Sequence, residues 1–247
     1  MFADFDLRRA RAFLKNPGWL TIVPARRRGL FVHAQLPGLR TGITLAGRHD
    51  RIEKLVVFGE NRTPREKPLP RPPALAEIFR LARARHPQLE ALARDFLLRQ
   101  VPAEKGHPLE TQIARRVAGR MAGYTHPVMT LTGSGNQGIF IGLPLRRLYA
   151  EQGDAILPAV VFALLAQVHL SARHDRLSSK CGLATKAGPA LAAGLAFAHG
   201  AGPAEIRRLF RAVPARLAGL TCTGAEPACG RKARQAFRVV WPPAIPT

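Results

Sequence analysis

The stretch from residue 59 to residue 73 constrains this 247-residue chain most, because the chain changes character across it. The stretch is polar and rich in proline, which is typical of an extended linker. Its prolines are Pro64, Pro68, Pro70, Pro72 and Pro73. Short strand-like segments separated by turn formers precede it, and apolar residues at helical spacing follow it. These patterns predict an α+β fold with a small antiparallel sheet and a larger, mostly helical domain.

Four regions follow from these patterns. Residues 1–60 are predicted to form the small α+β unit, 61–73 the linker, 74–237 the helical domain and 238–247 an irregular tail. The small unit is expected to hold a helix and several strands, at residues 7–14, 19–23, 30–36, 41–46 and 51–58. The helical domain is expected to hold helices at residues 74–85, 89–98, 111–122, 138–151, 156–170, 184–199 and 203–217.

The three cysteines of the chain all lie in its last third, each beside Gly, Ser, Thr or Pro. Buried structural cysteines usually behave as small hydrophobic residues, so these positions favour ligands instead. Three thiolates on a cube-shaped iron–sulfur cluster leave one iron open to a substrate. We predict Cys181, Cys222 and Cys229 as cluster ligands. The alternatives are inert thiols, or a structural zinc completed by a histidine such as His174 or His199.

A glycine-rich polar segment at residues 129–138 precedes the predicted helix at 138–151. Glycines permit positive φ and let backbone amides converge on an anion, and the helix dipole adds to this attraction. The candidate substrate-binding residues are Ser134, Gly135, Asn136 and Gln137. The alternative is an ordinary glycine-rich start of a helix. The segment is neither a Walker A loop nor a dinucleotide-binding fingerprint.

The formal net charge of +22 makes nucleic acid the first partner to consider. Basic residues are spread along the whole chain, however, and no zinc-finger spacing or RNA-recognition aromatic motif occurs. Nucleic acid is therefore kept only as an alternative partner. The first residues do not resemble a secretory signal, and the apolar stretch at 156–170 is too short and interrupted to span a bilayer. We expect a cytoplasmic protein without membrane contact.

Three motifs, in the same order along the chain, resemble the L-cysteine desulfidases. These belong with the alpha-subunit-like proteins of bacterial iron–sulfur L-serine dehydratases. The motifs are Gly-Ser-Gly-Asn-Gln-Gly at 133–138, Arg-Leu-Ser-x-x-Cys-Gly at 176–182 and Cys-x-Gly-x-x-x-x-Cys at 222–229. Residues 41–52 are also similar to the family's strand that ends in His-Thr-Asn-Ile, and the similarity covers about residues 7–237.

The resemblance implies an oxygen-sensitive lyase that eliminates sulfide from L-cysteine, or water from L-serine, to give pyruvate and ammonia. Cys181, Cys222 and Cys229 match the family's ligands of a 4Fe–4S cluster, and no pyridoxal phosphate is needed. The segment that begins at Ser134 would hold the carboxylate of the small amino-acid substrate. His49 matches a family histidine and is the candidate catalytic residue, although a lone histidine at a strand end is more often a surface residue.

Several family features are absent from this chain. The family's upstream Leu-Gly-Cys-Thr-Glu-Pro motif and its Asn-rich substrate loop have no counterpart here, so the chain resembles the family without its N-terminal segment. Asp50 and Arg51 replace the Thr and Asn after His49, and Leu183 replaces the second cysteine of Cys-Gly-Cys. The alternatives are an inactive truncated paralogue, or half of a split enzyme completed by a complementary chain. A homodimer is a further expectation.

Overall fold

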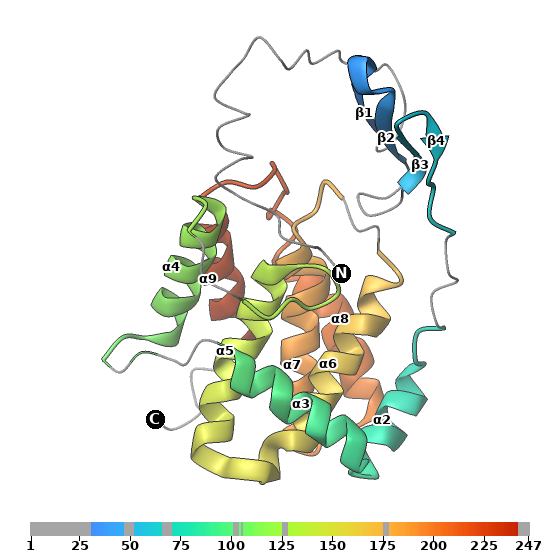
Figure 1. Ribbon diagram of the computed structural model, residues 1–247. Helices are drawn as coiled ribbons and strands as arrows, with labels where there is room; N and C mark the ends of the chain where they lie inside the picture. The colour runs from blue at the N-terminus through green and yellow to red at the C-terminus, as the bar shows by residue number, and fades with distance from the viewer. Residues whose placement is uncertain are drawn as a thin grey trace. The chain divides into compact units, whose positions relative to one another are not determined.

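The computed structural model describes residues 31–46, 52–65, 71–100, 104, 106–124, 128–174 and 178–241. The chain divides into two compact units, Met1–Lys67 and Pro68–Thr247. The predicted α+β class is confirmed, because a small antiparallel sheet precedes a mostly helical unit (Figure 1). The helix expected at 7–14, the strand expected at 19–23 and His49 lie outside the described residues.

The sheet of the first unit has the strand order β1-β2-β3-β4, and all neighbouring strands are antiparallel. The strands are β1 (Phe31–Leu36), β2 (Thr41–Ala46), β3 (Ile52–Val57) and β4 (Glu60–Asn61). The first three match the predicted strands closely. β4 lies partly in the predicted linker, because Phe58 and Gly59 adopt positive φ and turn the chain back onto β3.

The second unit contains the helices, joined by two short 3₁₀ or π segments. In chain order they are α2 (Leu75–Arg83), α3 (Pro87–Arg99), α4 (Leu109–Met121), α5 (Gly135–Gln152), η3 (Gly153–Ile156), α6 (Leu157–Ser171), η4 (Leu183–Ala187), α7 (Gly188–Ala198), α8 (Pro203–Arg216) and α9 (Cys229–Val240). The sequence patterns did not predict α9, which continues three residues into the expected tail. They also predicted one helix at 184–199, where the π-helical η4 precedes α7.

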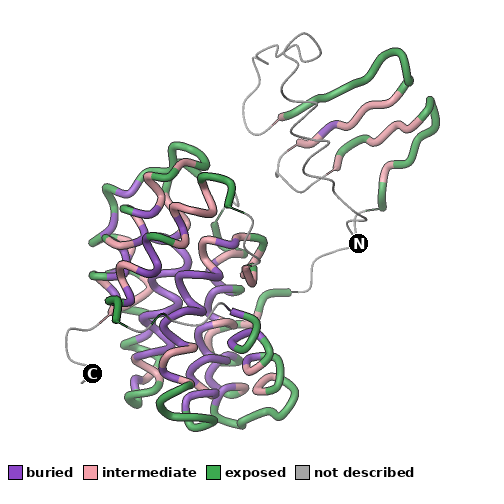
Figure 2. Tube along the Cα trace, turned by 60° about the vertical axis from the view of Figure 1, so that its left-hand side comes forward, coloured by how far each residue is buried: buried purple, intermediate pink, exposed green. Residues whose placement is uncertain are grey.

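The core of the helical unit lies around α6 and α7, which pack against each other. Figure 2 shows that the buried residues gather in the interior of the helical unit. Small residues such as Ala163 and Ala193 are fully buried and let these helices approach closely. α2 packs on α6, α8 on α7, and α4 lies beside α9. A helical core therefore holds the ends of α5, α6 and α9 in fixed positions.

The Gly135–Ser171 stretch is long and apolar enough to cross a membrane by length and composition alone. It comprises α5, η3 and α6 rather than one continuous α-helix. In its most apolar window, 61% of the residues are buried inside the helical unit. This burial is what a core helix requires, so the stretch is weak support for a membrane span.

His169, near the end of α6, connects that helix to the segment before α2. Its Nδ1 lies 2.8 Å from the carbonyl oxygen of Pro73, and its ring stacks on Phe210. Because a carbonyl oxygen only accepts, Nδ1 carries the proton in this contact. Burial lowers the pKa of His169, the Pro73 carbonyl opposes that effect, and the charge of Arg173 lowers the pKa further. The folded chain therefore holds His169 neutral more strongly than the unfolded chain does.

We expect the helical unit to lose stability as the pH falls below about 6.5, the ordinary histidine pKa. Between the two pKa values of His169, the unfolded chain binds a proton and the folded chain does not. The free energy of unfolding therefore falls as the pH falls, and it stops falling once the pH is below the pKa of His169 in the folded chain. His169→Gln should show a smaller loss in thermal unfolding between about pH 8 and pH 5. His199→Gln, a change at an exposed histidine, is the control. An equal pH dependence in His169→Gln and the wild type would contradict this account.

Candidate functional site

The structure brings the segments that carry Cys181 and Cys222 side by side. An isolated antiparallel bridge pairs Lys180 with Thr221. The amide of Cys181 donates to the Leu220 carbonyl at 2.9 Å, and the amide of Cys222 donates to the Ser179 carbonyl at 2.8 Å. Two segments about forty residues apart in sequence are therefore held together by backbone hydrogen bonds on either side of the bridge.

The thiol of Cys181 is within electrostatic range of the other two cysteines. Burial raises its pKa most, and charges on Cys222 and Cys229 would raise it further. The amides of Leu183 and Ala184, at the start of η4, act in the opposite direction because they donate hydrogen bonds to the sulfur. A thiol in this setting loses its proton most readily when a cation binds, since the cation supplies the missing positive charge.

The loop between Cys222 and Cys229 is fixed by an ammonium group from α9. The Nζ of Lys232 donates to the Thr223 hydroxyl at 2.9 Å and lies 3.1 Å from the Glu226 carboxylate. The Thr223 hydroxyl also donates to Glu226. These contacts hold the pKa of Glu226 below its ordinary value, with the Thr223 bond as the largest cause. Glu226 therefore shapes the loop as an ion-pair partner of Lys232.

Cys229 is the first residue of α9, and its position depends on that helix. Its amide donates to the Glu226 carbonyl at 2.9 Å, and its Sγ lies 3.6 Å from the Gly224 carbonyl oxygen. α9 is amphipathic and packs along α4. There Arg238 and Glu110 form a bidentate ion pair with N–O distances of 2.7 and 2.8 Å. The contact with α4 thus sets where the third cysteine lies.

The three cysteines are predicted to hold an iron–sulfur cluster, and a single ion is the alternative. Within the described ranges, no three His, Cys, Asp or Glu side chains are close enough to hold one metal ion. A zinc site completed by a histidine would need such a group. In a cube-shaped cluster each thiolate bonds a different iron, so the sulfurs lie farther apart than the ligands of one ion. The charges of Cys222 and Cys229 both act on Cys181, and cluster ligation by the three cysteines stays a prediction.

The glycine-rich segment forms a tight turn followed at once by α5. Leu131 and Ser134 exchange backbone hydrogen bonds of 3.1 and 3.0 Å, and Thr132 and Gly133 both adopt positive φ. Ser134 is the N-cap of α5, and its hydroxyl accepts from the amide of Gln137 at 3.4 Å. The helix thus begins at Gly135 and not at residue 138, so that three of the four candidate residues lie in its first turn.

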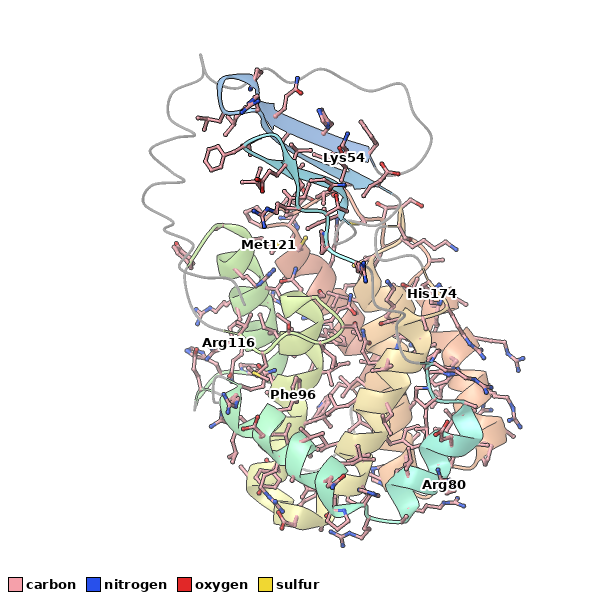
Figure 3. All side chains as sticks on the ribbon, turned by 45° about the vertical axis from the view of Figure 1, so that its right-hand side comes forward. Lys54, Arg80, Phe96, Arg116, Met121 and His174 are labelled. Atoms are coloured by element: carbon pink, nitrogen blue, oxygen red, sulfur yellow. The ribbon has the colours of Figure 1, made fainter. Side chains whose placement is uncertain are left out.

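The side chain of Asn136 faces α4. Its Oδ1 accepts from Nη1 of Arg120 at 3.2 Å, and its Nδ2 lies 3.4 Å from Sδ of Met121. Figure 3 labels Met121 at the end of α4. A Cβ on the neighbouring Gly135 would lie 2.5 Å from Nε of Arg120. The Arg120 guanidinium therefore packs against Gly135 and is hydrogen-bonded to Asn136.

Gln137 joins the glycine-rich segment to the cysteine segment. Its Nε2 lies 2.6 Å from where a Cβ would stand on Gly182, the residue after Cys181. Its Oε1 accepts from the amide of Gln167 on α6, a residue that is 0% exposed. Of the four candidate residues, Gln137 is the one that these contacts place next to a predicted ligand.

The polar cluster around Gln167 lies beneath the turn and was not predicted from the sequence. The Nε2 of Gln167 also donates to the hydroxyls of Thr132 at 3.1 Å and Ser171 at 3.2 Å, and Ser171 donates to Thr132 at 3.0 Å. Its Oε1 is buried without a hydrogen-bond partner in the described part of the chain. The available signal was a glutamine within the apolar 156–170 stretch, since buried polar groups are normally retained for a contact.

We expect Gln167→Leu to lower the free energy of unfolding by about 1–3 kcal/mol, because it removes the amide that donates to the half-buried side chains of Gln137, Thr132 and Ser171. The measurement is chemical denaturation followed by circular dichroism. Gln152→Leu, at an exposed position of α5, is the matched control and should stay within about 0.5 kcal/mol of the wild type. Equal stabilities of the two variants would show that the cluster does not hold the turn.

The sequence profile of the serine dehydratase alpha chain family matches residues 78–239, which is more than half of the chain. The matched region lies within the second compact unit and contains α3 to α8, most of α2 and α9, and all three cysteines. The chain therefore belongs to the serine dehydratase alpha chain family.

Similar curated proteins carry the name UPF0597 protein. The one from Oleidesulfovibrio alaskensis is 30% identical over 184 residues, which is 66% of this chain and 42% of that protein. The Thermosipho africanus protein is 34% identical over 122 residues, 49% of this chain and 30% of its own length. The chain thus spans less than half the length of these relatives. No solved structure gave a significant match.

Proposed function

We propose that this chain is an iron–sulfur-dependent lyase that eliminates sulfide from L-cysteine, or water from L-serine. The pairing of the Cys181 and Cys222 segments, with Gln137 of α5 against Gly182, is the observation that supports this proposal. Membership of the serine dehydratase alpha chain family supports a lyase. In the overall reaction, L-cysteine and water give pyruvate, ammonia and hydrogen sulfide, so no external oxidant or reductant is needed.

The three cysteines would hold a 4Fe–4S cluster, whose free iron supplies a Lewis acid for the leaving sulfur or hydroxyl of the substrate. No pyridoxal phosphate takes part in this proposal. The amides of Leu183 and Ala184 donate to the Cys181 sulfur and would stabilise its thiolate form. The ammonium of Lys232 adds a positive charge beside the loop that carries the other two thiols. Because burial raises the pKa of Cys181, cluster binding would drive the loss of its proton.

The start of α5 would bind the substrate carboxylate. The first amides of a helix have no acceptor within the helix, and the helix dipole favours an anion there. Ser134, Gly135, Asn136 and Gln137 are the residues proposed for this contact. Because Gln137 reaches Gly182, it would orient the substrate between the helix start and Cys181. His49 stays the proposed proton-transferring residue, outside the described residues.

A further part of the proposal is that another polypeptide supplies additional substrate contacts. A complementary chain is the proposed partner, as the designation alpha chain suggests. A cytoplasmic location, where iron–sulfur clusters and free thiols persist, belongs to the same proposal.

The experiment is anaerobic expression followed by an iron and sulfide assay and a visible absorption spectrum. The wild type should contain iron and show thiolate–iron charge-transfer absorption. Cys181→Ser, Cys222→Ser and Cys229→Ser should each lose most of both, whereas Ser179→Ala, at an exposed position near Cys181, should retain them. Release of pyruvate from L-cysteine and L-serine then distinguishes the substrates. A wild-type protein that contains no iron under these conditions would falsify the proposal.

A further inference from the structure

A cavity of about 220 Å³ lies in the helical unit where α3 ends and α4 and α5 face each other. One wall is apolar and consists of Val128, Ile139 and Leu143. Another wall carries three arginines of α4: Arg115 and Arg116 are adjacent, and Arg120 lies one turn after Arg116. The cavity is thus lined by a hydrocarbon surface and by guanidinium groups.

The charge of the cavity is positive. Among the described residues that line it, Glu104 is the acidic one, and it pairs with Nη2 of Arg116 at 3.0 Å. Figure 3 labels Arg116 on α4. No described acidic side chain forms an ion pair with Arg115 or Arg120. Three guanidinium groups against one carboxylate leave an excess of positive charge, which favours an anionic ligand.

Arg120 has donors to spare at this wall. Its contact among the described residues is the 3.2 Å hydrogen bond to Asn136, a neutral acceptor, through Nη1. A guanidinium carries five N–H donors and binds a carboxylate with two parallel hydrogen bonds. The side-chain amide of Gln100, by contrast, already donates through Nε2 to the Gly138 carbonyl at 3.1 Å. The arginines are therefore the groups that would select the ligand.

We propose that this cavity binds a small organic carboxylate with a short hydrocarbon body. The volume is below the roughly 300–1,000 Å³ of pockets for drug-sized ligands, which limits the ligand to a few carbon atoms. The carboxylate lies against Arg115 and Arg120, and the hydrocarbon part covers Val128, Ile139 and Leu143. The proposal depends on the cavity alone and holds whether or not the cysteines bind a cluster.

Occupancy of the cavity is coupled to the glycine-rich segment. The guanidinium that meets the ligand also holds Asn136 and contacts Gly135 at the start of α5. A bound carboxylate pairs with the spare N–H groups of Arg120 and repositions its guanidinium, which changes the restraint on Asn136 and the first turn of the helix. The ligand thus acts on the proposed substrate-binding turn from the α4 side.

The test uses hexanoate as the probe and titration calorimetry on the whole chain. We expect hexanoate to bind, acetate to bind more weakly, and the uncharged isostere hexanamide to bind at least about tenfold more weakly than hexanoate. Arg120→Met and Arg115→Gln should each weaken hexanoate binding by about tenfold. Arg211→Gln, at an exposed arginine of α8, is the matched control and should bind as the wild type does.

A second measurement requires no variant and so does not depend on how the variants fold. In a nitrogen-15 spectrum of the wild type, hexanoate should shift the Nε–H signal of Arg120. Equal binding of hexanoate and hexanamide, or unaltered binding in Arg120→Met, would overturn the proposal. Tighter binding of inorganic phosphate than of hexanoate would also overturn it, in favour of a phosphate site. Iron content, measured on the same samples, reports on the cysteines separately.

Discussion

Gly138→Ala is expected to destabilise the helical unit by about 3 kcal/mol or more. A Cβ at this position would lie 1.8 Å from the carbonyl oxygen of Met129 and 2.9 Å from its carbonyl carbon. Both are backbone atoms, so no side-chain rotation relieves the overlap. The first turn of α5 would have to move away from Met129. The free-energy cost of this movement exceeds the gain of about 1 kcal/mol that alanine normally brings to a helix in place of glycine.

The matched control is Gly219→Ala, since nothing lies within 4 Å of a Cβ at that position. Both variants are measured by chemical denaturation with circular dichroism as the signal. Gly219→Ala should stay close to the wild type. If Gly138→Ala unfolded within about 0.5 kcal/mol of Gly219→Ala, the close approach of Met129 to α5 would not exist in solution.

The glycines of residues 133–138 show where sequence reasoning succeeds and where it stops. The pattern predicted a turn and a helix start, and both occur. It assigned one role, conformational freedom, to every glycine, but only Gly133 of this segment has a positive φ. Gly135 and Gly138 are helical and are glycines because Arg120 and Met129 lie where a Cβ would be. Such contacts depend on tertiary packing, which local pattern does not report.

The helix α9 was missed for a related reason. Its buried residues recur at helical spacing, but two of them, Ala233 and Ala236, give a weak apolar signal. Basic residues lie among the buried positions, and helix propensity alone is too weak to indicate a helix there. Because Cys229 begins α9, the sequence predicted the residue but not the element that positions it.

Cluster ligation by the three cysteines stays a prediction, and the surroundings of these residues could not be predicted from the sequence. Residue context indicated Cys181, Cys222 and Cys229 as one set, and the structure brings their segments together. The π-helical η4, whose first amides face Cys181, could not be predicted, because an i→i+5 turn is set by the packing around it. π-Helical turns occur frequently at functional sites, so η4 is a further reason to test these cysteines first.

Phe162→Ala is expected to lower the free energy of unfolding of the helical unit by about 3–5 kcal/mol. Phe162 is fully buried on α6, and its ring lies 4.9 Å from Phe79 and 4.6 Å from Phe197 between centroids. This group of three rings joins α2, α6 and α7 in a core otherwise filled largely by alanine and leucine. Its neighbours are small or in tight contact and cannot close the space that the ring leaves.

The measurement is chemical denaturation, with Phe58→Ala as the control because Phe58 is 64% exposed in the first unit. Phe162→Ala should therefore remove a large share of the roughly 5–15 kcal/mol that stabilises a folded domain, while Phe58→Ala changes little. Iron content should survive this change below the melting temperature, because the ring cluster includes no residue that hydrogen-bonds to a cysteine. Loss of iron from a folded Phe162→Ala protein would instead show that the α6–α7 core positions the cysteines directly.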